Sequence, residues 1–580
     1  MSISRRRFAG LALGAAGIAL SGARHARAGG TPLIPELTGS QLDLVVSRRV
    51  VDFGTGPRLA TTINGTVPGP TLRLREGDEV IIRVHNRLAE STSIHWHGIL
   101  LPYQMDGVPG LSFNGIPPGA TFTYRFTLRQ SGTYWYHSHT KMQELTGMYG
   151  ALIVEPVGGN GKAAQRDHVV VLSDWSDAAP ARVLARLKTE SDVYNRARPT
   201  AGDFLRDVRG QGLRSALDMR RMWQQMRMNP TDLADVSASA LNYLVNGRVA
   251  QTPFEALFRP GETVRLRCIN AAAHTFFDVR IPGEKLRVIQ ADGVDVEPVS
   301  VDEFRIGPGE TLDVSVRPEN DACTLFAQSM DRSGFAAAFL TTASGLRAPI
   351  PAPDPRALLS MGDMMGAMTH APGHGGQAAH HKHGQHVHQV MSQAAGTTTN
   401  NPLAIPSRVV RHARSEYGAS VDMRVDLPRT NLDDPGVGLR NNGRRVLTLA
   451  DLHSLGGALD ARSPGREIEL HLTGNMERYT WSFDGLEFAR STPVHFRHGE
   501  RLRVILQNDT MMTHPMHLHG LWSELESPDG RFQVRRHTIP VQPAQRISFL
   551  VTADAIGRWA WHCHLMFHMH SGMFREVLVS

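Results

Sequence analysis

Residues 75–86 read REGDEVIIRVHN, and this stretch decides the fold because the chain contains it in three versions. The second version is RPGETVRLRCIN at residues 259–270, and the third is RHGERLRVILQN at residues 497–508. Each has an arginine, a glycine turn with an acidic neighbour, an alternating segment and a closing asparagine. A turn followed by period-two alternation predicts a half-buried β-strand. Three versions in order predict a repeated β domain.

A second repeated segment follows each version of the first. It reads IPPGATFTYRF from Ile116, IGPGETLDVSV from Ile306 and VQPAQRISFLV from Val541. Two segments recurring in constant order predict three antiparallel β-sandwiches of one plan, so the expected fold class is all-β. We place the three domains at residues 29–160, 161–346 and 402–580.

Two stretches interrupt this plan. Residues 178–242, inside the second domain, are rich in Arg, Leu and Met with helical spacing and predict a helical insertion. Its Met219, Met222 and Met226 share one helix face; we favour packing into the core over a thioether surface for Cu(I). Residues 347–401 are rich in Pro, Gly and His and predict a linker.

Length and charge exclude some classes of protein. The chain has 580 residues, 41% of them hydrophobic and 20% charged, which is typical of a soluble protein with several domains. Its net charge is +7, but five arginines lie within the first 28 residues and leave only +2 for the remainder. A nearly balanced surface gives no reason to expect a nucleic-acid partner. We expect a monomer.

The first 28 residues have the features of an export signal. Arginines at positions 5–7 and Phe8 precede an apolar run from Ala9 to Ala23, and Ala26-Arg27-Ala28 resembles a cleavage site. The paired arginines predict a twin-arginine signal and a periplasmic location. An uncleaved membrane anchor is the alternative, but the apolar run is short for a membrane span. We expect no membrane span in the mature chain.

Histidine pairs lie at equivalent positions of the first and third domains. In the second domain the same positions hold Val279, Ile281, Ala327 and Ser329. The four His-x-His pairs are His95 and His97, His137 and His139, His517 and His519, and His562 and His564. Residues i and i+2 of a strand point to the same side, roughly 6.6 Å apart. Eight imidazoles in registered positions therefore predict a cluster of three copper ions.

Cys563 lies between two of these histidines and points to the opposite strand face. A thiolate with two nitrogens and a weak axial ligand forms a blue-copper site. His514, His568 and Met573 are residues of the required types nearby. A buried, inert cysteine is the alternative. Because Cys563 is bonded to its neighbours in the chain, an electron at its copper has a short covalent route to His562 and His564.

The motifs HWHG, YHSH, HPMHLHG and HCHLMFHMHSGM resemble the four copper motifs of the multicopper oxidases. Closer similarity is to the bacterial copper-resistance protein A subfamily, through MWQQMRMNPTDLADVS, TNLDDPGVGLRNNGRRVLTLADL and GMFREV. The resemblance implies three cupredoxin-like Greek-key domains and four copper ions. It assigns His95 and His517 to the type 2 copper, and His97, His137 and His564 to one type 3 copper. His139, His519 and His562 fall to the other type 3 copper, and Cys563, His514, His568 and Met573 to the type 1 copper.

The proton supply departs from the family pattern. Reduction of dioxygen to water consumes four protons, so a carboxylate is expected near the cluster. Several family members have a glutamate shortly after the cysteine of the fourth motif, where this chain has Met566 and Met569. Asp106 is our candidate for the proton relay; a purely turn-forming role before Gly107 is the alternative.

The other two cysteines leave two interpretations open. Cys268 and Cys323 either form a disulfide in an oxidising compartment or are separate, small buried residues. We prefer the second interpretation, because spacing alone does not show that their Cα atoms come close enough for a disulfide.

The linker contains many potential copper ligands and little apolar content, so we expect it to be mobile and to capture copper. These residues are Met361, Met364, Met365, Met368, His370, His374, His380, His381, His383, His386 and His388. The expected activity is oxidation of Cu(I), and of phenols as in laccases, with dioxygen as acceptor. A copper-sequestering protein is the alternative. A copper nitrite reductase is a third class, against which the four paired motifs argue.

Overall fold

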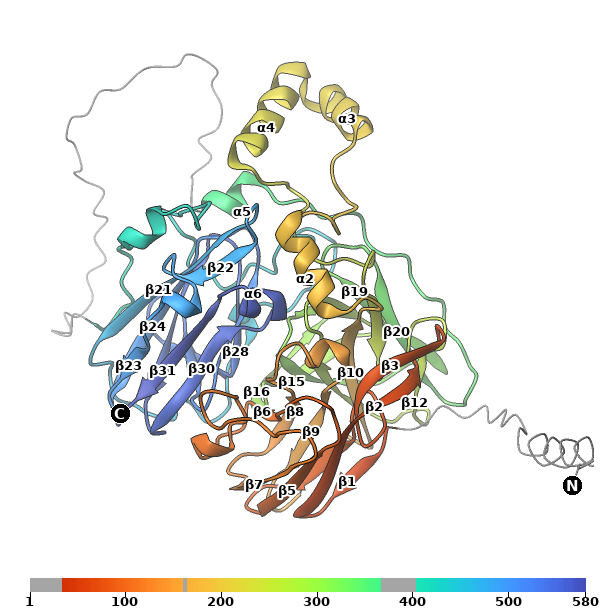
Figure 1. Ribbon diagram of the computed structural model, residues 1–580. Coiled ribbons are helices and arrows are strands. Elements are labelled where there is room, and N and C mark those ends of the chain that lie inside the picture. Colours follow the sequence, from red (N-terminus) through yellow and green to blue (C-terminus); the bar gives the residue numbers. More distant parts are fainter. Residues whose placement is uncertain (1–33, 160–163, 367–402) are drawn as a thin grey trace, which may run out of the picture. The chain divides into compact units, whose positions relative to one another are not determined.

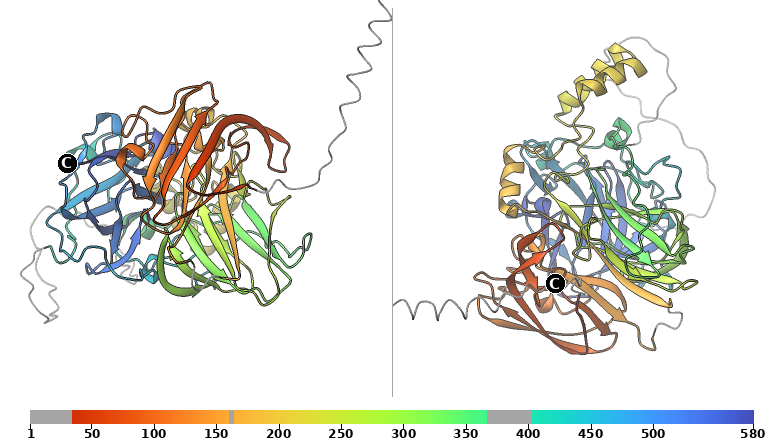
Figure 2. Two further views of the ribbon diagram at one scale, coloured as in Figure 1. Left: turned by 90° about the horizontal axis from the view of Figure 1, so that it is seen from below. Right: turned by 90° about the vertical axis from the view of Figure 1, so that its right-hand side faces the viewer.

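The computed structural model describes residues 34–159, 164–366 and 403–580 (Figure 1). Its strands form six sheets, two in each third of the chain, which make three β-sandwich domains. Figure 2 shows the strands as three groups that follow chain order, coloured red to orange, green and blue. The predicted all-β class and the three repeated sandwiches are confirmed.

The first domain pairs a five-stranded sheet, β1-β4-β9-β8-β6, with a four-stranded sheet, β3-β2-β5-β7. Their strands are β1 (Glu36–Thr38), β2 (Gln41–Asp52), β3 (Pro57–Ile63), β4 (Thr71–Arg75), β5 (Glu79–Asn86), β6 (His95–His97), β7 (Thr121–Thr127), β8 (Gly132–His137) and β9 (Tyr149–Glu155).

The second domain pairs a six-stranded sheet, β11-β10-β13-β18-β15-β16, with a five-stranded sheet, β12-β20-β19-β14-β17. Their strands are β10 (Arg166–Trp175), β11 (Asn242–Val245), β12 (Phe254–Leu257), β13 (Val264–Asn270), β14 (Phe277–Arg280), β15 (Leu286–Ala291), β16 (Val294–Val301), β17 (Glu303–Ile306), β18 (Thr311–Val316), β19 (Ala322–Ser329) and β20 (Phe335–Thr341).

The third domain repeats the strand order of the second, with sheets β22-β21-β24-β29-β26-β27 and β23-β31-β30-β25-β28. Their strands are β21 (Glu467–Asn475), β22 (Thr480–Phe483), β23 (Val494–Phe496), β24 (Arg501–Asn508), β25 (His514–Leu518), β26 (Ser523–Glu526), β27 (Phe532–Arg536), β28 (Thr538–Val541), β29 (Arg546–Thr552), β30 (Gly557–Cys563) and β31 (Phe574–Val579).

The two sequence repeats form hydrogen-bonded neighbours. The first repeat ends in β5, β13 or β24, and the second contains β7, β18 or β29; each pair is antiparallel. The sheets are nevertheless mixed, which corrects the antiparallel expectation. An early strand of each domain, β2, β10 or β21, lies parallel to the first repeat, because the chain crosses to the other sheet before it returns.

The expected half-buried alternation holds in β5 but not in β24. In β5 the side chains of Val80, Ile82 and Val84 are buried and their neighbours are partly exposed. In β24 every residue is buried. Polar side chains of β24 are buried with partners: Arg503 forms an ion pair with Glu526 at 2.7 Å. The period-two pattern thus predicted the strand but not the cover on its second face.

The closing asparagine of each first repeat ties it to the second repeat. The amide nitrogens of Asn86, Asn270 and Asn508 donate to the carbonyl oxygens of Ile116, Ile306 and Val541, at 2.7 to 2.9 Å. These acceptors are the first residues of the quoted second repeats. The asparagine therefore fixes the loop that follows each first-repeat strand, and in domains one and three that loop leads to histidines.

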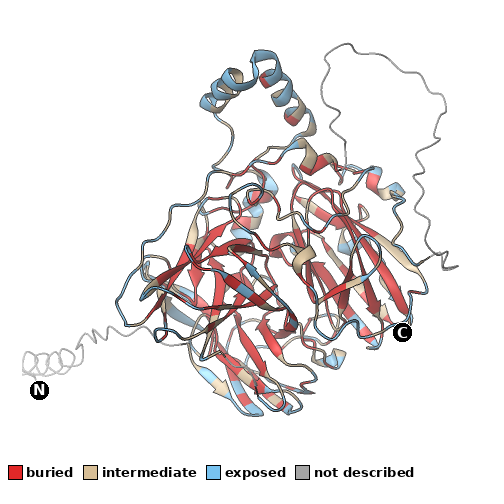
Figure 3. Cartoon of the chain, turned by 180° about the vertical axis from the view of Figure 1, so that it is seen from behind, coloured by how far each residue is buried: buried red, intermediate tan, exposed pale blue. Residues whose placement is uncertain are grey.

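The helices lie mostly outside the sheets. The insertion in the second domain contains α2 (Pro180–Thr189), α3 (Ala201–Gln211) and α4 (Leu213–Met226). Figure 3 shows α3 and α4 largely exposed, and Met219 is 39% exposed, so the preferred core role for the methionine face is wrong there. Met222 and Met226 are partly buried. Helix α4 packs mainly on α3, while Trp223 and Met226 contact the apolar core.

The remaining helical segments are short. They are α5 (Met361–Met365), α6 (Met566–His570), η1 (Tyr103–Met105), η2 (Glu144–Thr146), η3 (Arg414–Tyr417), η4 (Leu449–Asp451) and η5 (Phe488–Arg490). Among the described residues, no helix is long and apolar enough to cross a membrane.

Two predictions about the linker and the cysteines meet different outcomes. Met361, Met364 and Met365 form α5 and contact the apolar core, and Met364 is fully buried, so these three do not belong to an unpacked segment. Met368 and the seven linker histidines lie outside the described residues. Cys268 and Cys323 are buried, free thiols, as we preferred.

Candidate metal centre

Strand register places the histidine pairs side by side within each domain. In the first domain, β6 and β8 are antiparallel neighbours, and His95 stands opposite His137. In the third domain, β25 and β30 are antiparallel neighbours, and His517 stands opposite His562. The strand after the second repeat is β8 or β30, and the loop after the first repeat leads into β6 or β25, so the repeated plan determines this arrangement.

The histidines of the first and third domains then meet each other. The Nε2 atoms of His95 and His517 lie 3.4 Å apart, and those of His139 and His562 lie 3.2 Å apart. His519 Nε2 lies 3.1 Å from His562 Nε2. The groups whose ligand atoms lie within 4.8 Å of one another include His95, His517 and His519; His97, His137 and His564; and His139, His519 and His562. The last two are the predicted type 3 sets.

Hydrogen bonds on the outer nitrogen fix the orientation of several of these rings. Nδ1 of His95 donates to the backbone oxygen of Asp106 at 2.8 Å, and Nδ1 of His517 to that of His537 at 2.6 Å. His137 Nδ1 lies 2.8 Å from a Glu144 carboxylate oxygen. An imidazole that donates through Nδ1 keeps the lone pair on Nε2 for a metal.

The inward ring nitrogens are suited to holding a metal ion. Within the described residues, His137 Nε2 and both ring nitrogens of His97 and His564 are buried without a hydrogen-bond partner. Burial lowers the pKa of these three histidines well below the usual value, so the rings are neutral. Buried polar atoms are rarely left unpaired. Neutral, converging imidazole nitrogens fit copper ions, which would pair them.

The second domain contributes a wall to this cluster although it lacks the histidines. A Cβ atom built on Gly309 would stand 2.7 Å from His564 Cδ2 and 3.2 Å from His97 Nε2. Its φ of +87° also favours glycine. The glycine of the second repeat thus lets backbone from domain two approach the ligands closely.

The cysteine site is a separate group of buried side chains. Cys563 Sγ lies 3.5 Å from His514 Nδ1 and 3.8 Å from His568 Nδ1, and the two nitrogens lie 3.1 Å apart. Met573 is fully buried, and its backbone carbonyl accepts a hydrogen bond from the Cys563 amide. Burial raises the pKa of Cys563 well above its usual value, so a thiolate here requires a cation beside it. A sulfur and two nitrogens suit copper.

An acidic residue of the insertion supports this site. Asp235 Oδ2 lies 2.6 Å from His568 Nε2 and accepts a 2.8 Å hydrogen bond from the Tyr479 hydroxyl. Trp481 stacks on the His568 ring with centroids 3.8 Å apart. Thr510 Oγ1 lies 2.7 Å from His514 Nε2. Both imidazoles are therefore held with Nδ1 toward Cys563.

Two carboxylates contact the histidine cluster. Asp106 is buried, and its Oδ2 lies 2.9 Å from His519 Nδ1 while its Oδ1 lies 3.3 Å from His95 Nδ1. It also ends η1, so the turn role and the ligand contact coexist. Glu144 contacts His137, and burial raises its pKa well above the usual range.

A small cavity borders the type 3 ligands. Met566 and Met569 line it together with Glu144, Lys141 and His564. The methionines thus occupy the side where a glutamate was expected from the resemblance, and Glu144 supplies a carboxylate there from another segment. Another cavity is lined by His95, His517 and His537.

Three residues of the site were missed by sequence reasoning. Asp235, Glu144 and His537 all contact predicted ligands or their neighbours, and His537 forms a close group with His97 and His517. None stands in a repeated position. Asp235 does lie inside the quoted stretch MWQQMRMNPTDLADVS, which was the available signal.

Comparison with known families gives one consistent result. Three family models described as multicopper oxidase match residues 46–158, 166–344 and 461–580. These segments contain all four His-x-His pairs and the cysteine site.

Similar proteins extend over nearly the whole chain. Copper resistance protein A of Escherichia coli is 50% identical over 568 residues, covering 95% of this chain and 94% of its own. The copper resistance protein A homolog of Pseudomonas syringae pv. tomato is also 50% identical, covering 94% and 93%. Among solved structures, Fet3p, described as a multicopper oxidase that functions in iron import, has a TM-score of 0.63 at 18% identity, covering 94% of this chain and 91% of its own.

Proposed function

The chain belongs to the multicopper oxidase family, whose members are oxidoreductases that reduce dioxygen, and from this premise we propose that it oxidises Cu(I) and phenols in the periplasm. The observation that carries the redox role is the continuity of the two centres. Cys563 belongs to one group, and its chain neighbours His562 and His564 belong to the other. The similarity of the chain to copper resistance proteins supports Cu(I) as the substrate.

We assign the ligands as the resemblance implies, because the same side chains converge. His514, Cys563, His568 and Met573 would hold the type 1 copper, and His95 and His517 the type 2 copper. The type 3 ions would be held by His97, His137 and His564 and by His139, His519 and His562. When bound, copper supplies one-electron transfer at the first position and four-electron reduction of dioxygen at the cluster.

The protein's own groups orient the ligands and handle protons. Asp106 accepts from His519 and approaches His95, so it holds one ligand from each of the two domains. Glu144 contacts His137 through Nδ1 and so helps to orient this ligand. Since reduction of dioxygen consumes four protons, we assign their delivery to these two carboxylates. Glu144 lines a cavity beside the cluster, which gives water a place from which to reprotonate it.

Electrons from the reductant would arrive near Asp235. This carboxylate is buried, bonds His568, and has one oxygen, Oδ1, without a hydrogen-bond partner among the described residues. Its negative charge lies next to a copper ligand and would favour a cationic reductant such as Cu(I). Burial works against this charge, yet His568 and Tyr479 hold the pKa of Asp235 below its usual value.

Oxygen uptake distinguishes an oxidase from a protein that only sequesters copper. The copper-loaded protein should consume dioxygen with Cu(I) and with a phenol, and should absorb near about 600 nm through its thiolate–copper bond. A Cys563→Ser variant should lose both the absorption and the uptake while it still binds Cu(I) elsewhere. A blue protein that consumes no dioxygen with either reductant contradicts the oxidase proposal.

A deletion that leaves the packed core intact tests the role of the linker. Because Met361, Met364 and Met365 pack in α5, removal should begin at residue 367 rather than 361. Deletion of residues 367–391 should lower Cu(I) turnover more than phenol turnover. Equal losses would contradict copper capture by this stretch.

The periplasmic location rests on the first 28 residues and is tested by export. Replacing Arg5 and Arg6 with lysine should leave the protein unprocessed in the cytoplasmic fraction. Unchanged periplasmic recovery would contradict the twin-arginine route.

A further inference from the structure

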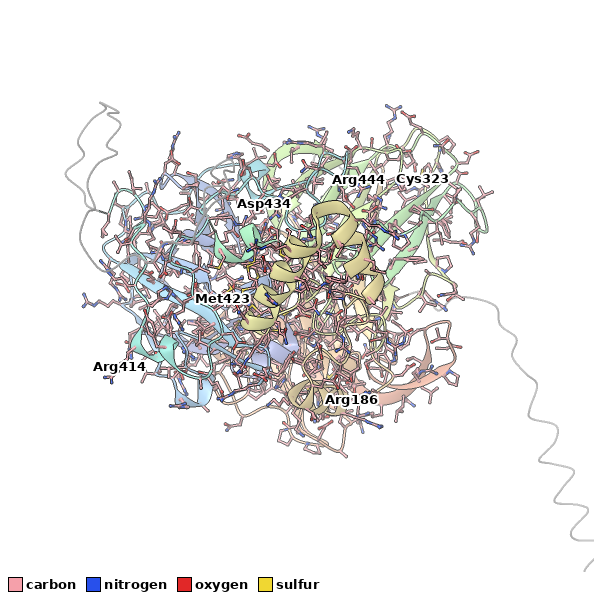
Figure 4. The ribbon with its side chains drawn as sticks, turned by 90° about the horizontal axis from the view of Figure 1, so that it is seen from above. Arg186, Cys323, Arg414, Met423, Asp434 and Arg444 are labelled. Carbon is pink, nitrogen blue, oxygen red and sulfur yellow. The ribbon has the colours of Figure 1, made fainter. Side chains whose placement is uncertain are left out.

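A second group of histidines and carboxylates lies in the third domain, apart from the copper ligands. It joins His412 and Glu416 to His471 on β21 and to Asp509, which follows β24. Glu416 is in η3, whose first residue, Arg414, is labelled in Figure 4 beside the blue strands. These four side chains are at most 6% exposed. Segments far apart in sequence are thus brought to one buried point.

One atom from each side chain faces the same centre. His412 Nδ1 lies 2.7 Å from Glu416 Oε2 and 3.5 Å from Asp509 Oδ2. His471 Nδ1 lies 3.0 Å from the same glutamate oxygen and 2.9 Å from the same aspartate oxygen. The two nitrogens therefore alternate with the two oxygens around a ring.

Outer hydrogen bonds orient three of these four groups. Glu416 Oε1 accepts from the Ala413 amide at 2.7 Å, and Asp509 Oδ1 accepts from Gln507 Nε2 at 2.9 Å. His471 Nε2 lies 3.0 Å from Glu469 Oε1. A carboxylate behind the outer nitrogen of a histidine is the usual support for a metal-binding imidazole. The inner atoms contact one another: His412 Nδ1 lies at hydrogen-bond distance from Glu416 Oε2, and His471 Nδ1 from Asp509 Oδ2.

The spacing overlaps that of the predicted copper ligands in the same molecule. Nitrogen–nitrogen distances in the predicted copper sets are 3.1 to 3.4 Å, against 2.7 to 3.5 Å for the nitrogen–oxygen distances here. In both places the ligand atoms come from several segments that converge on a buried centre. Two neutral imidazoles and two carboxylates would balance the charge of a divalent cation.

The geometry points to a divalent-cation site at His412, Glu416, His471 and Asp509, separate from the oxidase copper ions. Two imidazole nitrogens and two carboxylate oxygens suit Zn²⁺ or Cu²⁺ rather than Mg²⁺ or Ca²⁺, which take oxygen ligands. The cation fastens the segment that carries His412 and Glu416, which precedes β21, to two strands of the third-domain sheet. Its role is structural, because all four ligands come from the protein.

The alternative to a bound cation is protonation of both histidines. If both histidines are charged, their N–H groups donate to Glu416 and Asp509, and the cluster is an ion-pair network. The acidic surroundings favour positive charge in either form. Burial alone would lower the pKa of His471, but its hydrogen bonds to Asp509, Glu416 and Glu469 raise it to about 11. Only the position of a bound ion separates the two forms.

Anomalous diffraction from the copper-loaded, full-length protein locates that ion. Crystals soaked in Zn²⁺ should show a peak among the four atoms, about 2.0–2.2 Å from each, in the difference between data above and below the zinc edge. A separate soak in Cu²⁺, measured at the copper edge, shows whether copper takes the same position. Absence of both peaks overturns the proposal and leaves the ion-pair network.

Metal counting with variants provides the solution test. The variants His412→Gln and Asp509→Asn should each bind about one zinc ion fewer per chain than the wild type, at equal absorption near 600 nm. The matched control is His453→Gln, an exposed histidine of the same third of the chain, which should bind as many as the wild type. Equal counts in all four folded proteins overturn the proposal. If a variant fails to fold, the diffraction result on the wild type decides.

Discussion

At the scale of single residues, Asp235 contacts His568 through Nε2, on the side of the ring opposite the Cys563 group. Carboxylates in this position raise the basicity of a ligand and hold its orientation. Asp235 also accepts from Tyr479, so its charge is part of a buried network. It lies beside the type 1 ligands but does not touch the histidine cluster.

Asp235→Asn should therefore slow oxidation of the reductant and leave copper binding at the cluster intact. We expect turnover to fall about 10- to 100-fold. The reduction potential of the copper that gives the blue absorption should rise, because removing a negative charge favours the reduced ion. Oxygen uptake and a spectroelectrochemical titration measure the two effects. Asp218→Asn, on the exposed part of α4, is the control, and an unchanged potential would contradict this role for Asp235.

Gly309 allows a test of the contact between domain two and the cluster. Gly309→Ala places a methyl group 2.7 Å from His564 Cδ2, so copper per chain should fall below that of the wild type. Gly283 has the same φ, +87°, but a Cβ atom there would meet nothing within 4 Å. Gly283→Ala should therefore cause the same backbone strain, about 1–2 kcal/mol, without loss of copper. Metal analysis measures the copper content of both variants. Equal contents would contradict the close contact between Gly309 and the cluster ligands.

The predicted ligands and the missed residues differ in how they are encoded. His95, His137, His517 and His562 stand in strand positions that the repeat fixes, so counting along the sequence found them. Asp235, Glu144 and His537 reach the site from the insertion, from η2 and from the turn between β27 and β28. Their positions depend on how separate segments pack, which no periodic pattern records.

At the scale of elements, the asparagine that closes each first repeat holds two elements together. Asn270 donates to Thr275 and Ile306 in domain two, and Asn508 makes equivalent bonds to Met512 and Val541 in domain three. The sequence showed the asparagine as part of a pattern, while its partners became evident only in the structure.

Replacing these asparagines separates stability from metal binding. Asn270→Ala and Asn508→Ala should each lower the free energy of unfolding by about 1–3 kcal/mol, because buried carbonyl groups lose their donors. Only Asn508→Ala should also reduce copper content, since its loop leads to His514 and His517 on β25. Denaturant titration and metal analysis provide the comparison. Equal copper loss in both variants would show that the hydrogen bonds of Asn508 have no specific effect on the nearby ligands.

The predictability of the elements followed the strength of their periodicity. The repeated strands were predicted where they occur, because turns and alternation are local signals. The parallel pairing of β2 with β5 was missed, since it depends on a crossover between sheets. Met219 of α4 was misjudged, because helical spacing shows which residues share a face and not whether each is covered, whereas Met226 does pack against the core.

At the scale of the whole molecule, the histidine cluster lies where the first and third domains meet, and the second domain closes it. Arg536, one residue before His537, forms a 2.8 Å ion pair with Asp292 of domain two. A backbone oxygen of His537 in turn holds His517. Domain two therefore keeps its sandwich, without copper ligands, as part of the support for the cluster.

Burial of many neutral histidines makes the stability of the copper-free molecule depend on pH. Burial lowers the pKa of His562 to about 3 and of His537 to about 4, from an unfolded value near 6.5. Between these values the unfolded chain binds protons that the folded chain does not. Stability is thus present above pH 6.5 and is lost as the pH falls, at about 1.4 kcal/mol per pH unit for each such histidine. His471, whose pKa is raised, works in the opposite direction, but it is one group.

We therefore expect the copper-free protein to melt at least about 10 °C lower at pH 5.5 than at pH 7.5. Copper binds the folded form and should raise the melting temperature at both pH values by mass action. Calorimetry of the copper-free and copper-loaded protein measures both effects. In a copper-free His537→Gln variant the dependence on pH should be shallower, because one buried imidazole is gone. A melting temperature that stays constant or rises on acidification would contradict the neutral, buried state of these ligands.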